Sequence, residues 1–287
     1  MTPQLACAVL SLRNEPGLVA AVRSLLAQDR PAEIVVVNSG GGDPGATLRK
    51  AGISVHVATR HERLTPGAVR NLGIAATSAP FIAFLAADCI AEPGWVSGRL
   101  REHRGGALAV ASAITNAYPH SCCAWASYML MFSRRVPARS VPQSDRLLFG
   151  VSYARELFER FGQFREDMRT GEDEEFNDRF TNDVAITWAP DVRTAHRHPT
   201  GLRALMLDQY RRGIRMSRAK FEIVGRPLAW DIARSTVRHL PRDVRYVWQG
   251  VDPQYQTRLV GACLLAAPAV VAYVLGLLLS PGVKLSK

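Results

Sequence analysis

The chain has 287 residues, of which 47% are hydrophobic, and it carries a formal net charge of +11. This length and apolar content are enough for a proper core, and they predict one large domain or one domain with an appendage. The five cysteines are odd in number and lack metal-ligand spacing, which argues against a cysteine-based metal motif and indicates reduced thiols in a cytoplasmic domain.

Strand and helix patterns alternate along the first ninety residues. Apolar strand patterns occur in "LACAVLSL", "AEIVVVNSGGGD", "ISVHVAT" and "APFIAFLAADC", and helical spacing occurs in "GLVAAVRSLLAQ" and "GAVRNLGIAAT". This alternation predicts right-handed βαβ units and a parallel sheet flanked by helices. Ligands of such sheets bind beyond the carboxyl ends of the strands. We therefore expect ligand contacts at "SLRNE", "NSGGGD" and "AADC". The amino terminus lacks a basic start and a long apolar stretch, so we expect no signal peptide.

The middle of the chain is less regular. Residues 115–146 read as a long connection that can hold a mobile or acceptor-facing loop. Residues 170–180, "TGEDEEFNDRF", then concentrate five carboxylates in a basic chain. Thr170 suits a helix cap, the acids suit the first turn, and Glu175 and Arg179 suit a surface pair. These residues alone support a plain helix start as well as a functional site.

The carboxyl-terminal part predicts contact with a membrane. Residues 201–258 hold twelve basic and five acidic side chains, a pattern that suits nucleic acid or an anionic membrane. Residues 227–251 mix Trp, Tyr and Leu with Arg, which is typical of a pair of helices in a headgroup layer. Residues 260–279 follow without a charge and are long enough to cross a bilayer. This run favours membrane over nucleic acid, and a buried core helix is the alternative.

Seven motifs occur in an order that resembles the family 2 glycosyltransferases. They are "LSLRNEPGLVAAVRSLLAQ", "IVVVNSGGGD", "PGAVRNLGI", "FIAFLAADCIAEPGW", "GQFREDMRTGEDEEF", "TAHRHP" and "QYRRG". The resemblance implies the GT-A fold, an α/β fold with a mostly parallel central sheet flanked by helices. It also implies a catalytic domain at residues 1–220, to which we add interfacial amphipathic helices at 221–258 and a transmembrane helix at 259–280.

The resemblance assigns the catalytic base and the metal ligands. Asp173 matches the aspartate of the family's Glu-Asp motif, which takes the proton of the attacking acceptor hydroxyl. Asp88 matches the later aspartate of the DXD motif, which implies manganese or magnesium. Ala86 stands where the first aspartate of that motif is expected, so the motif is incomplete. His196 is the expected histidine ligand, with His198 as its rival.

The donor-binding residues follow from the same resemblance. Glu15 falls at the nucleotide edge, and Asn38 stands where an aspartate commonly reads a uracil ring. Arg70 matches a basic residue that contacts the diphosphate, along with Asp88 and its metal. In related enzymes a Gln-x-x-Arg element near the acceptor and the departing diphosphate matches Gln209 and Arg212, although arginines are also common in helices beside membranes.

Together these features predict a membrane-associated inverting glycosyltransferase. It would move a sugar from a nucleotide-diphospho-sugar, with UDP favoured, to a hydroxyl of a lipid-linked or saccharide acceptor, a lipid or polysaccharide precursor. Twelve basic residues before the apolar run and two lysines after it predict a catalytic domain on the cytoplasmic face of the membrane. Two alternatives are a sugar nucleotidyltransferase and a non-catalytic membrane adaptor that retains the fold.

Overall fold

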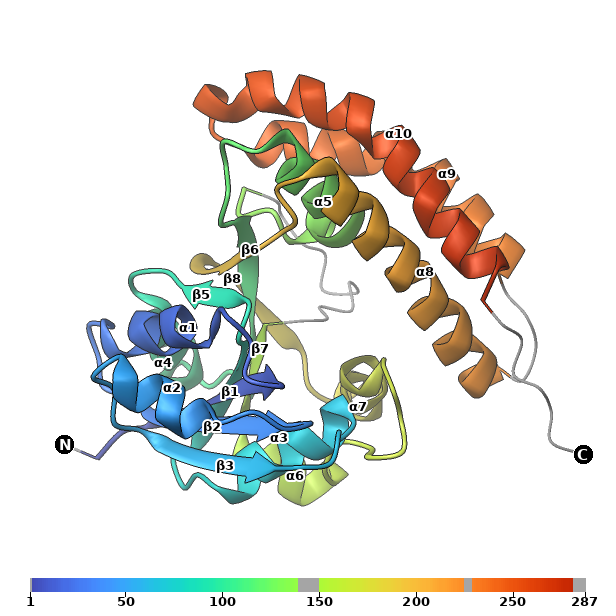
Figure 1. The fold of residues 1–287 in the computed structure, drawn as a ribbon. Coiled ribbons are helices and arrows are strands. Elements are labelled where there is room, and N and C mark those ends of the chain that lie inside the picture. Colours follow the sequence, from blue (N-terminus) through green and yellow to red (C-terminus); the bar gives the residue numbers. More distant parts are fainter. Residues whose placement is uncertain (1, 139–149, 225–228, 281–287) are drawn as a thin grey trace, which may run out of the picture. The chain divides into compact units, whose positions relative to one another are not determined.

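The computed structural model describes residues 2–138, 150–224 and 229–280 (Figure 1). By contacts the chain divides into two compact units, Met1–Thr115 with Ser140–His196, and Asn116–Arg139 with Arg197–Lys287. We call them the first and the second unit and describe each by itself. The functional boundaries expected at residues 220 and 258 stay predictions.

The first unit contains a sheet and most of the shorter helices. Its strands are β1 (Leu5–Leu12), β2 (Glu33–Ser39), β3 (His56–Arg60), β4 (Phe81–Ala86), β5 (Cys89–Ala91), β6 (Ala109–Asn116), β7 (Val151–Ala154) and β8 (Ile186–His196). Its helices are α1 (Leu18–Leu26), α2 (Pro44–Lys50), α3 (Pro66–Ala75), α4 (Trp95–Arg104), α6 (Arg155–Phe161) and α7 (Glu172–Phe180).

The strands form one sheet in the order β3-β2-β1-β4-β7-β6-β8-β5. The first four strands of that order are parallel, as the βαβ pattern predicts. The pairs β4–β7, β6–β7 and β5–β8 are antiparallel, so the sheet is mixed rather than purely parallel. The reason is that β5, β7 and β8 do not belong to consecutive strand-helix-strand units.

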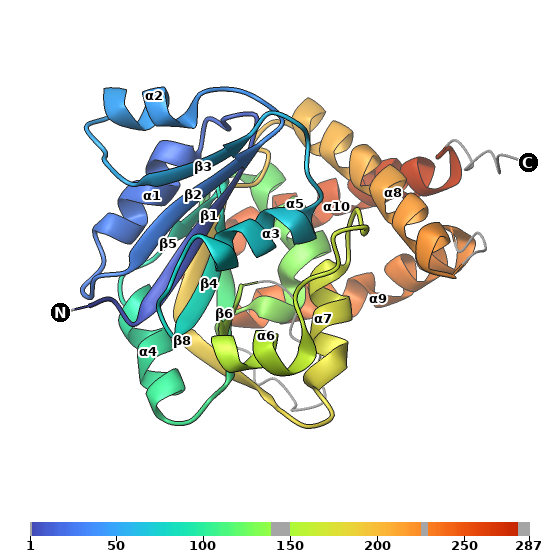
Figure 2. The ribbon, with the colours of Figure 1, turned by 90° about the horizontal axis from the view of Figure 1, so that it is seen from below.

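Alternate residues of β1 point into two different cores. Leu5, Cys7 and Val9 pack with α1 and α4 on one face of the sheet. Ala6 and Ala8 pack on the other face, where α3, α6 and α7 lie. Figure 2 shows α3 and α6 along this second face. Coverage on both faces leaves the carboxyl ends of the parallel strands as the edge at which polar side chains can gather.

The start of α3 is held against the segment that precedes α7. The Thr65 hydroxyl donates to the Glu166 carbonyl (2.6 Å), and the Asn71 side chain both donates to and accepts from the backbone of Phe164 (2.9 and 3.1 Å). A Cβ added at Gly67 would lie 2.0 Å from the Arg165 carbonyl oxygen. Only glycine therefore permits this close approach of the two segments.

The second unit is helical. It contains α5 (Cys122–Phe132), the 3-10 helix η1 (Ser133–Arg135), α8 (Leu202–Val224), α9 (Ala229–Gly250), the 3-10 helix η2 (Pro253–Tyr255) and α10 (Gln256–Leu278). The expectation of an irregular connection at residues 115–146 is wrong at α5, which Ser121 caps and whose Trp125 and Tyr128 are buried. Residues 139–149 of that connection lie outside the described part of the chain.

The helix pair expected at residues 227–251 is a single helix over its described residues. Pro241 lies inside α9 without ending it. Proline removes one backbone hydrogen bond but does not always break a helix that packs against neighbours. Next along the chain, Pro253–Leu278 is the one stretch of the described residues that is long and apolar enough to cross a membrane. This agrees with the expected apolar helix in length and composition.

We predict that Gly67→Ala destabilises the first unit, because the added methyl group meets a backbone carbonyl that cannot move alone. The expected loss is about 1–3 kcal/mol in the free energy of unfolding, measured by denaturant titration. Gly45→Ala is a matched control, since Gly45 also follows a proline at a helix start but meets only the ends of the Arg49 and Asp43 side chains. Equal stability of the two variants would contradict the tight contact.

Candidate functional site

The loop after β1 and the turn after β2 are tied together by Asn38. This side chain is fully buried, accepts from the Asn14 amide (3.0 Å) and donates to the Gly41 carbonyl (2.9 Å). Arg13 and Asn14 both have positive φ, 55° and 58°, which non-glycine residues rarely adopt. Asn38 thus holds a strained loop in place, and reading of a nucleotide base by its amide stays a prediction.

Glu15 lies in the same loop, close to Asp88. A Cβ added at Gly17 would lie 2.2 Å from the carbonyl oxygen of Ala87, so this loop rests directly on the turn after β4. Burial, followed by the negative charge of Asp88, raises the pKa of Glu15 from 4.5 to about 7. The Glu15 carboxyl is therefore harder to ionise than a free glutamate side chain.

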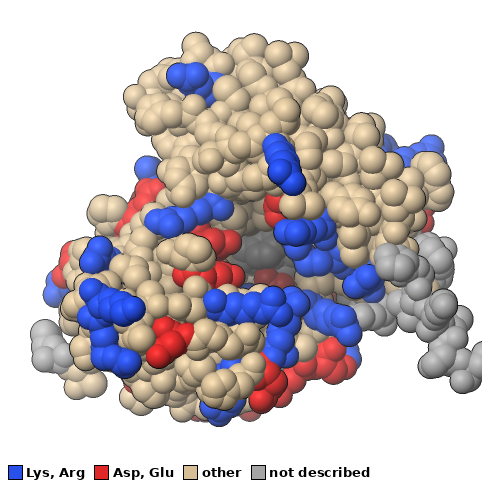
Figure 3. Space-filling model, in the orientation of Figure 1, with Lys and Arg blue, Asp and Glu red and all other residues tan. Residues whose placement is uncertain are grey.

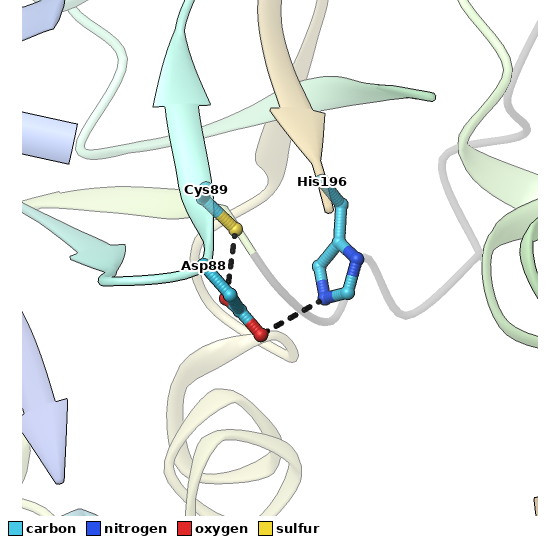
Figure 4. Close-up of side chains that lie close together, drawn as sticks. All are labelled: Asp88, Cys89 and His196. Carbon is cyan, nitrogen blue, oxygen red and sulfur yellow. Dashed lines mark hydrogen bonds and ion pairs between the residues drawn. The ribbon is translucent and has the colours of Figure 1, made fainter. Parts of the chain in front are cut away.

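Asp88, Cys89 and His196 form a cluster at the start of β5 and the end of β8 (Figure 4). Cys89 pairs directly with His196 across the antiparallel ladder, which brings the histidine beside the preceding aspartate. His196 Nε2 lies 3.5 Å from Asp88 Oδ2, and the Cys89 thiol donates to Asp88 Oδ1 at 3.4 Å. One ligand atom from each of the three residues lies within 4.8 Å of the other two. Cys89 was not among the expected site residues, because only the β5–β8 register reveals it.

The rival histidine has a different environment. His198 belongs to the second unit, is buried, and its Nδ1 lies 3.1 Å from the Ser127 hydroxyl. Its ring packs at right angles to Tyr128 and also contacts Phe132. These contacts are typical of a histidine in a packed core. Of the two candidate histidines, His196 is the one that lies beside Asp88.

Arg70 joins α3 to the start of α7. Its guanidinium pairs with the buried carboxylate of Glu172 and lies over the rings of Phe84 and Phe164, 5.7 and 5.5 Å from their centroids. Asp173, the next residue, is 8% exposed and is close enough to Arg70 to interact with its charge. Phe84 lies on β4, so this second cluster adjoins the strand that leads to Asp88.

The carboxylates at residues 172–175 have separate environments. The expectation that Thr170 caps this helix is wrong. Gly171, with φ of 83°, is the N-cap residue, and no side chain caps the helix start. Glu175 and Arg179 form the expected pair, with a nitrogen–oxygen contact of 2.9 Å. Glu172 and Asp173 face inward, and Asp173 Oδ1 accepts from the Glu174 amide at 3.0 Å.

Gln209 and Arg212 lie in the second unit, on α8. Gln209 is fully buried, and Arg212 donates to its side-chain oxygen at 3.4 Å and to the Leu130 carbonyl at 3.5 Å. The Arg212 guanidinium also lies 5.9 Å from the Tyr273 ring centroid. These contacts give both residues a packing role, and donor binding by them stays a prediction.

We predict a pH-dependent stability difference between the wild type and Glu15→Gln, measured as thermal midpoints with metal chelated. Because the folded chain raises the Glu15 pKa from 4.5 to about 7, the folded state binds this proton more tightly than the unfolded state. The stabilisation is present below about pH 4.5 and is lost as the pH rises through about 7. The thermal midpoint of the wild type should therefore fall relative to that of Glu15→Gln as the pH rises from about 4.5 to about 7. Exposed Glu62→Gln is the control, and parallel curves for the wild type and Glu15→Gln would contradict the assignment.

A family model and one curated protein match the chain by sequence. The model of "Glycosyl transferase family 2" matches residues 7–155, just over half of the chain. The succinoglycan biosynthesis protein ExoU of Rhizobium meliloti (strain 1021) is 34% identical over 97 residues. That match covers 32% of this chain and 28% of ExoU, so the chain matches only a part of this curated relative.

Solved structures share the fold at low sequence identity. The mannosyltransferase PcManGT from Pyrobaculum calidifontis, solved with GDP-Man and Mn2+, aligns with a TM-score of 0.59 at 13% identity and covers 98% of this chain and 88% of its own. S. aureus TarS 1–349, solved with UDP-GlcNAc, aligns with a TM-score of 0.54 at 12% identity, over 96% of this chain and 90% of its own. The family model shows that the chain belongs to glycosyl transferase family 2, and the mixed sheet and the solved structures show that it has the GT-A fold.

Proposed function

We propose that the protein transfers a sugar from a nucleotide-diphospho-sugar to a hydroxyl group with inversion at the anomeric carbon, and that a divalent metal assists. One observation carries this proposal. Asp88 and His196 lie side by side where β4 and β8 end. Arg70 on α3 pairs with Glu172, which precedes Asp173, and contacts Phe84 of the same strand β4. A metal ligand pair, a cation and a buried carboxylate are the parts that this reaction needs.

The residues at the strand ends fit a divalent cation. Asp88 supplies a carboxylate oxygen and His196 an imidazole nitrogen, and manganese accepts both kinds of ligand. When bound there, the cation would neutralise charge on the donor diphosphate. The proposal gains support from PcManGT, whose structure was solved with Mn2+. Ala86 leaves the DXD motif with a single carboxylate, and neighbouring Glu15 is a second acid close to Asp88.

The transfer itself requires one proton acceptor and no protein nucleophile. Asp173 takes the proton of the acceptor hydroxyl as its oxygen bonds to the anomeric carbon and the bond to the diphosphate oxygen breaks. The electrons of that bond leave with the diphosphate, whose charge Arg70 can stabilise. Glu172 positions Arg70 through their ion pair and so positions the start of α7 that carries Asp173.

The donor and the acceptor are proposed by chemical class. TarS was solved with UDP-GlcNAc and PcManGT with GDP-Man, so both bases occur among proteins of this fold. We propose a UDP-linked sugar first, because residue 38 lies where related enzymes commonly read a uracil ring, although Asn38 stands there in place of the usual aspartate. ExoU is a succinoglycan biosynthesis protein, which supports a lipid or polysaccharide precursor as the acceptor. The basic residues and apolar helix of the second unit support a site at the cytoplasmic face of a membrane.

The family assignment favours a glycosyltransferase over a sugar nucleotidyltransferase. Release of diphosphate from a nucleoside triphosphate would revive the nucleotidyltransferase alternative. A non-catalytic adaptor would show no metal-dependent hydrolysis of any nucleotide sugar. A panel of nucleotide sugars tested for thermal stabilisation with manganese present identifies the donor without an acceptor.

We predict that Asp173→Asn lowers the rate of sugar transfer by about 10²–10⁴-fold and leaves the donor affinity nearly unchanged, because the carboxamide keeps the shape but cannot accept the proton. Steady-state kinetics and donor titration by calorimetry measure the two effects. Asp178→Asn is the matched control, an exposed aspartate on the same helix α7. Turnover above half of the wild-type value in Asp173→Asn would rule Asp173 out as the base.

Metal-dependent donor binding should depend on Asp88. We expect Asp88→Ala to abolish the gain in donor affinity that manganese gives, and His196→Ala to weaken it less, because the incomplete DXD motif leaves one carboxylate ligand. Calorimetry with and without manganese measures this gain, and exposed Asp183→Ala is the control. An unchanged donor affinity in Asp88→Ala with manganese would show that the metal binds elsewhere.

A further inference from the structure

Helix α10 has one apolar face that the second unit leaves exposed. Its large exposed side chains include Val260, Leu264, Val271, Leu275 and Leu278, with Leu264 exposed by 76% and Val271 by 58%. Their spacing of three, four and seven residues places them along one side of the helix. We call these five residues the apolar stripe. Residues 259–279 contain no charged side chain, and Figure 3 shows an almost uncharged surface over α10.

The opposite face of α10 is packed closely against the second unit. Ala262, Ala266 and Ala269 are buried there. A Cβ added at Gly276 would lie 2.0 Å from the Tyr210 carbonyl oxygen on α8, and one added at Gly213 would lie 2.1 Å from the Tyr273 carbonyl oxygen on α10. Glycines at the crossing let the two backbones touch, so α10 is an integral part of this helical layer and not a free tail.

Helix α8 is charged where α10 crosses it. Asp208, Arg211, Arg212 and Arg215 surround Gly213 in the sequence, and the Arg212 guanidinium lies 5.9 Å from the Tyr273 ring centroid. If α10 crossed a bilayer with this packing kept, these charges would enter the hydrocarbon core beside it. Charged side chains at that depth are strongly unfavourable. The packing therefore conflicts with a simple transmembrane span.

Helix α9 adds a composition typical of the membrane interface. Trp230 and Trp248 are exposed by 74% and 39%, and exposed Arg234 and Arg245 lie between them in the sequence. Indole rings prefer the headgroup level, and arginines attract anionic lipids. A helix with one apolar face and charged neighbours suits a position in the plane of the interface.

We propose that the second unit binds one leaflet of an anionic membrane with α10 lying parallel to its surface and the apolar stripe inserted among the lipid chains. This inference rests on the proposed membrane association and specifies its geometry. The occupant of the exposed face is a lipid surface, because the stripe is uncharged over the length of a helix while the flanking helices carry arginines. The protein then enters the membrane from one side only.

Protease access to tags in sealed inside-out membrane vesicles tests the geometry directly. A tag fused after Lys287 and a tag fused before Met1 should both be cleaved by added protease without detergent, because both ends lie on the cytoplasmic side. Protection of either tag until detergent is added would mean that α10 spans the membrane, and the proposal would be overturned.

Vesicle binding by the purified full-length protein tests the apolar stripe. The double variant Leu264→Glu/Val271→Glu should bind vesicles of phosphatidylglycerol and phosphatidylcholine at least about tenfold more weakly, because two apolar side chains leave the lipid and two charges replace them. Both positions are exposed, so circular dichroism should show an unchanged fold. Asn182→Glu, an exposed site of the first unit, is the control for added charge. Unchanged binding of the double variant would overturn the proposal.

Two further readouts separate the possible failures. Sedimentation velocity without lipid reveals whether the stripe pairs two copies of the chain. The lipid assignment would be overturned if the wild type were a dimer, the double variant were a monomer, and both bound vesicles equally well. Donor hydrolysis in detergent tests the proposed function apart from the membrane. Intact hydrolysis with a protected tag would refute only the in-plane geometry, whereas absent hydrolysis with accessible tags would refute only the enzyme mechanism.

Discussion

The ion pair between Arg70 and Glu172, whose side chains are 16% and 6% exposed, is the interaction on which the arrangement of the candidate site depends. A buried charge is costly unless it is paired, and removal of one partner of such a pair typically costs about 3–5 kcal/mol. The pair joins α3 to α7, two helices separated by about a hundred residues of chain, and its guanidinium lies over the rings of Phe84 and Phe164. Asp173 follows Glu172 directly, so the same contact determines where the proposed base lies.

A second constraint is the antiparallel register of β5 and β8. It sets Cys89 opposite His196 and so places an imidazole beside Asp88. A shift by one residue would turn His196 to the other face of the sheet. The close contact of Gly17 with Ala87 adds the loop that carries Glu15 to this neighbourhood. Asp88, His196 and the loop that carries Glu15 are thus brought together by backbone contacts.

Sequence patterns predicted those parts of the fold that depend on local periodicity. The alternating patterns up to residue 89 predicted β1 to β4 with helices α1 and α3, since each of these shows its own apolar period, whereas α2 was not predicted. The antiparallel strands could not be predicted in the same way, because their pairing joins segments far apart in the chain. Helix α5 was missed because no regular apolar spacing stood out after Arg101, whereas its aromatic residues pack within the second unit.

The candidate site was found by motif for Asp88, His196, Arg70 and Asp173, and the structure adds what motifs do not encode. Cys89 belongs to the cluster only through strand register, and Glu172 gains its role only through contact with Arg70. For the apolar run near the carboxyl end, the sequence predicted a helix long enough to span a membrane. It did not reveal that one face of this helix packs against the second unit. Contacts between distant residues were needed for each of these points.

The central claim is that the donor and its metal bind at the strand ends marked by Asp88 and His196. Anomalous diffraction from crystals soaked with manganese and a UDP-sugar measures this position directly. The account predicts a manganese peak within coordinating distance of an Asp88 carboxylate oxygen and His196 Nε2, with the diphosphate bound to the same ion. A bound donor whose manganese lies elsewhere, or a donor bound at this place without any manganese peak, would contradict it.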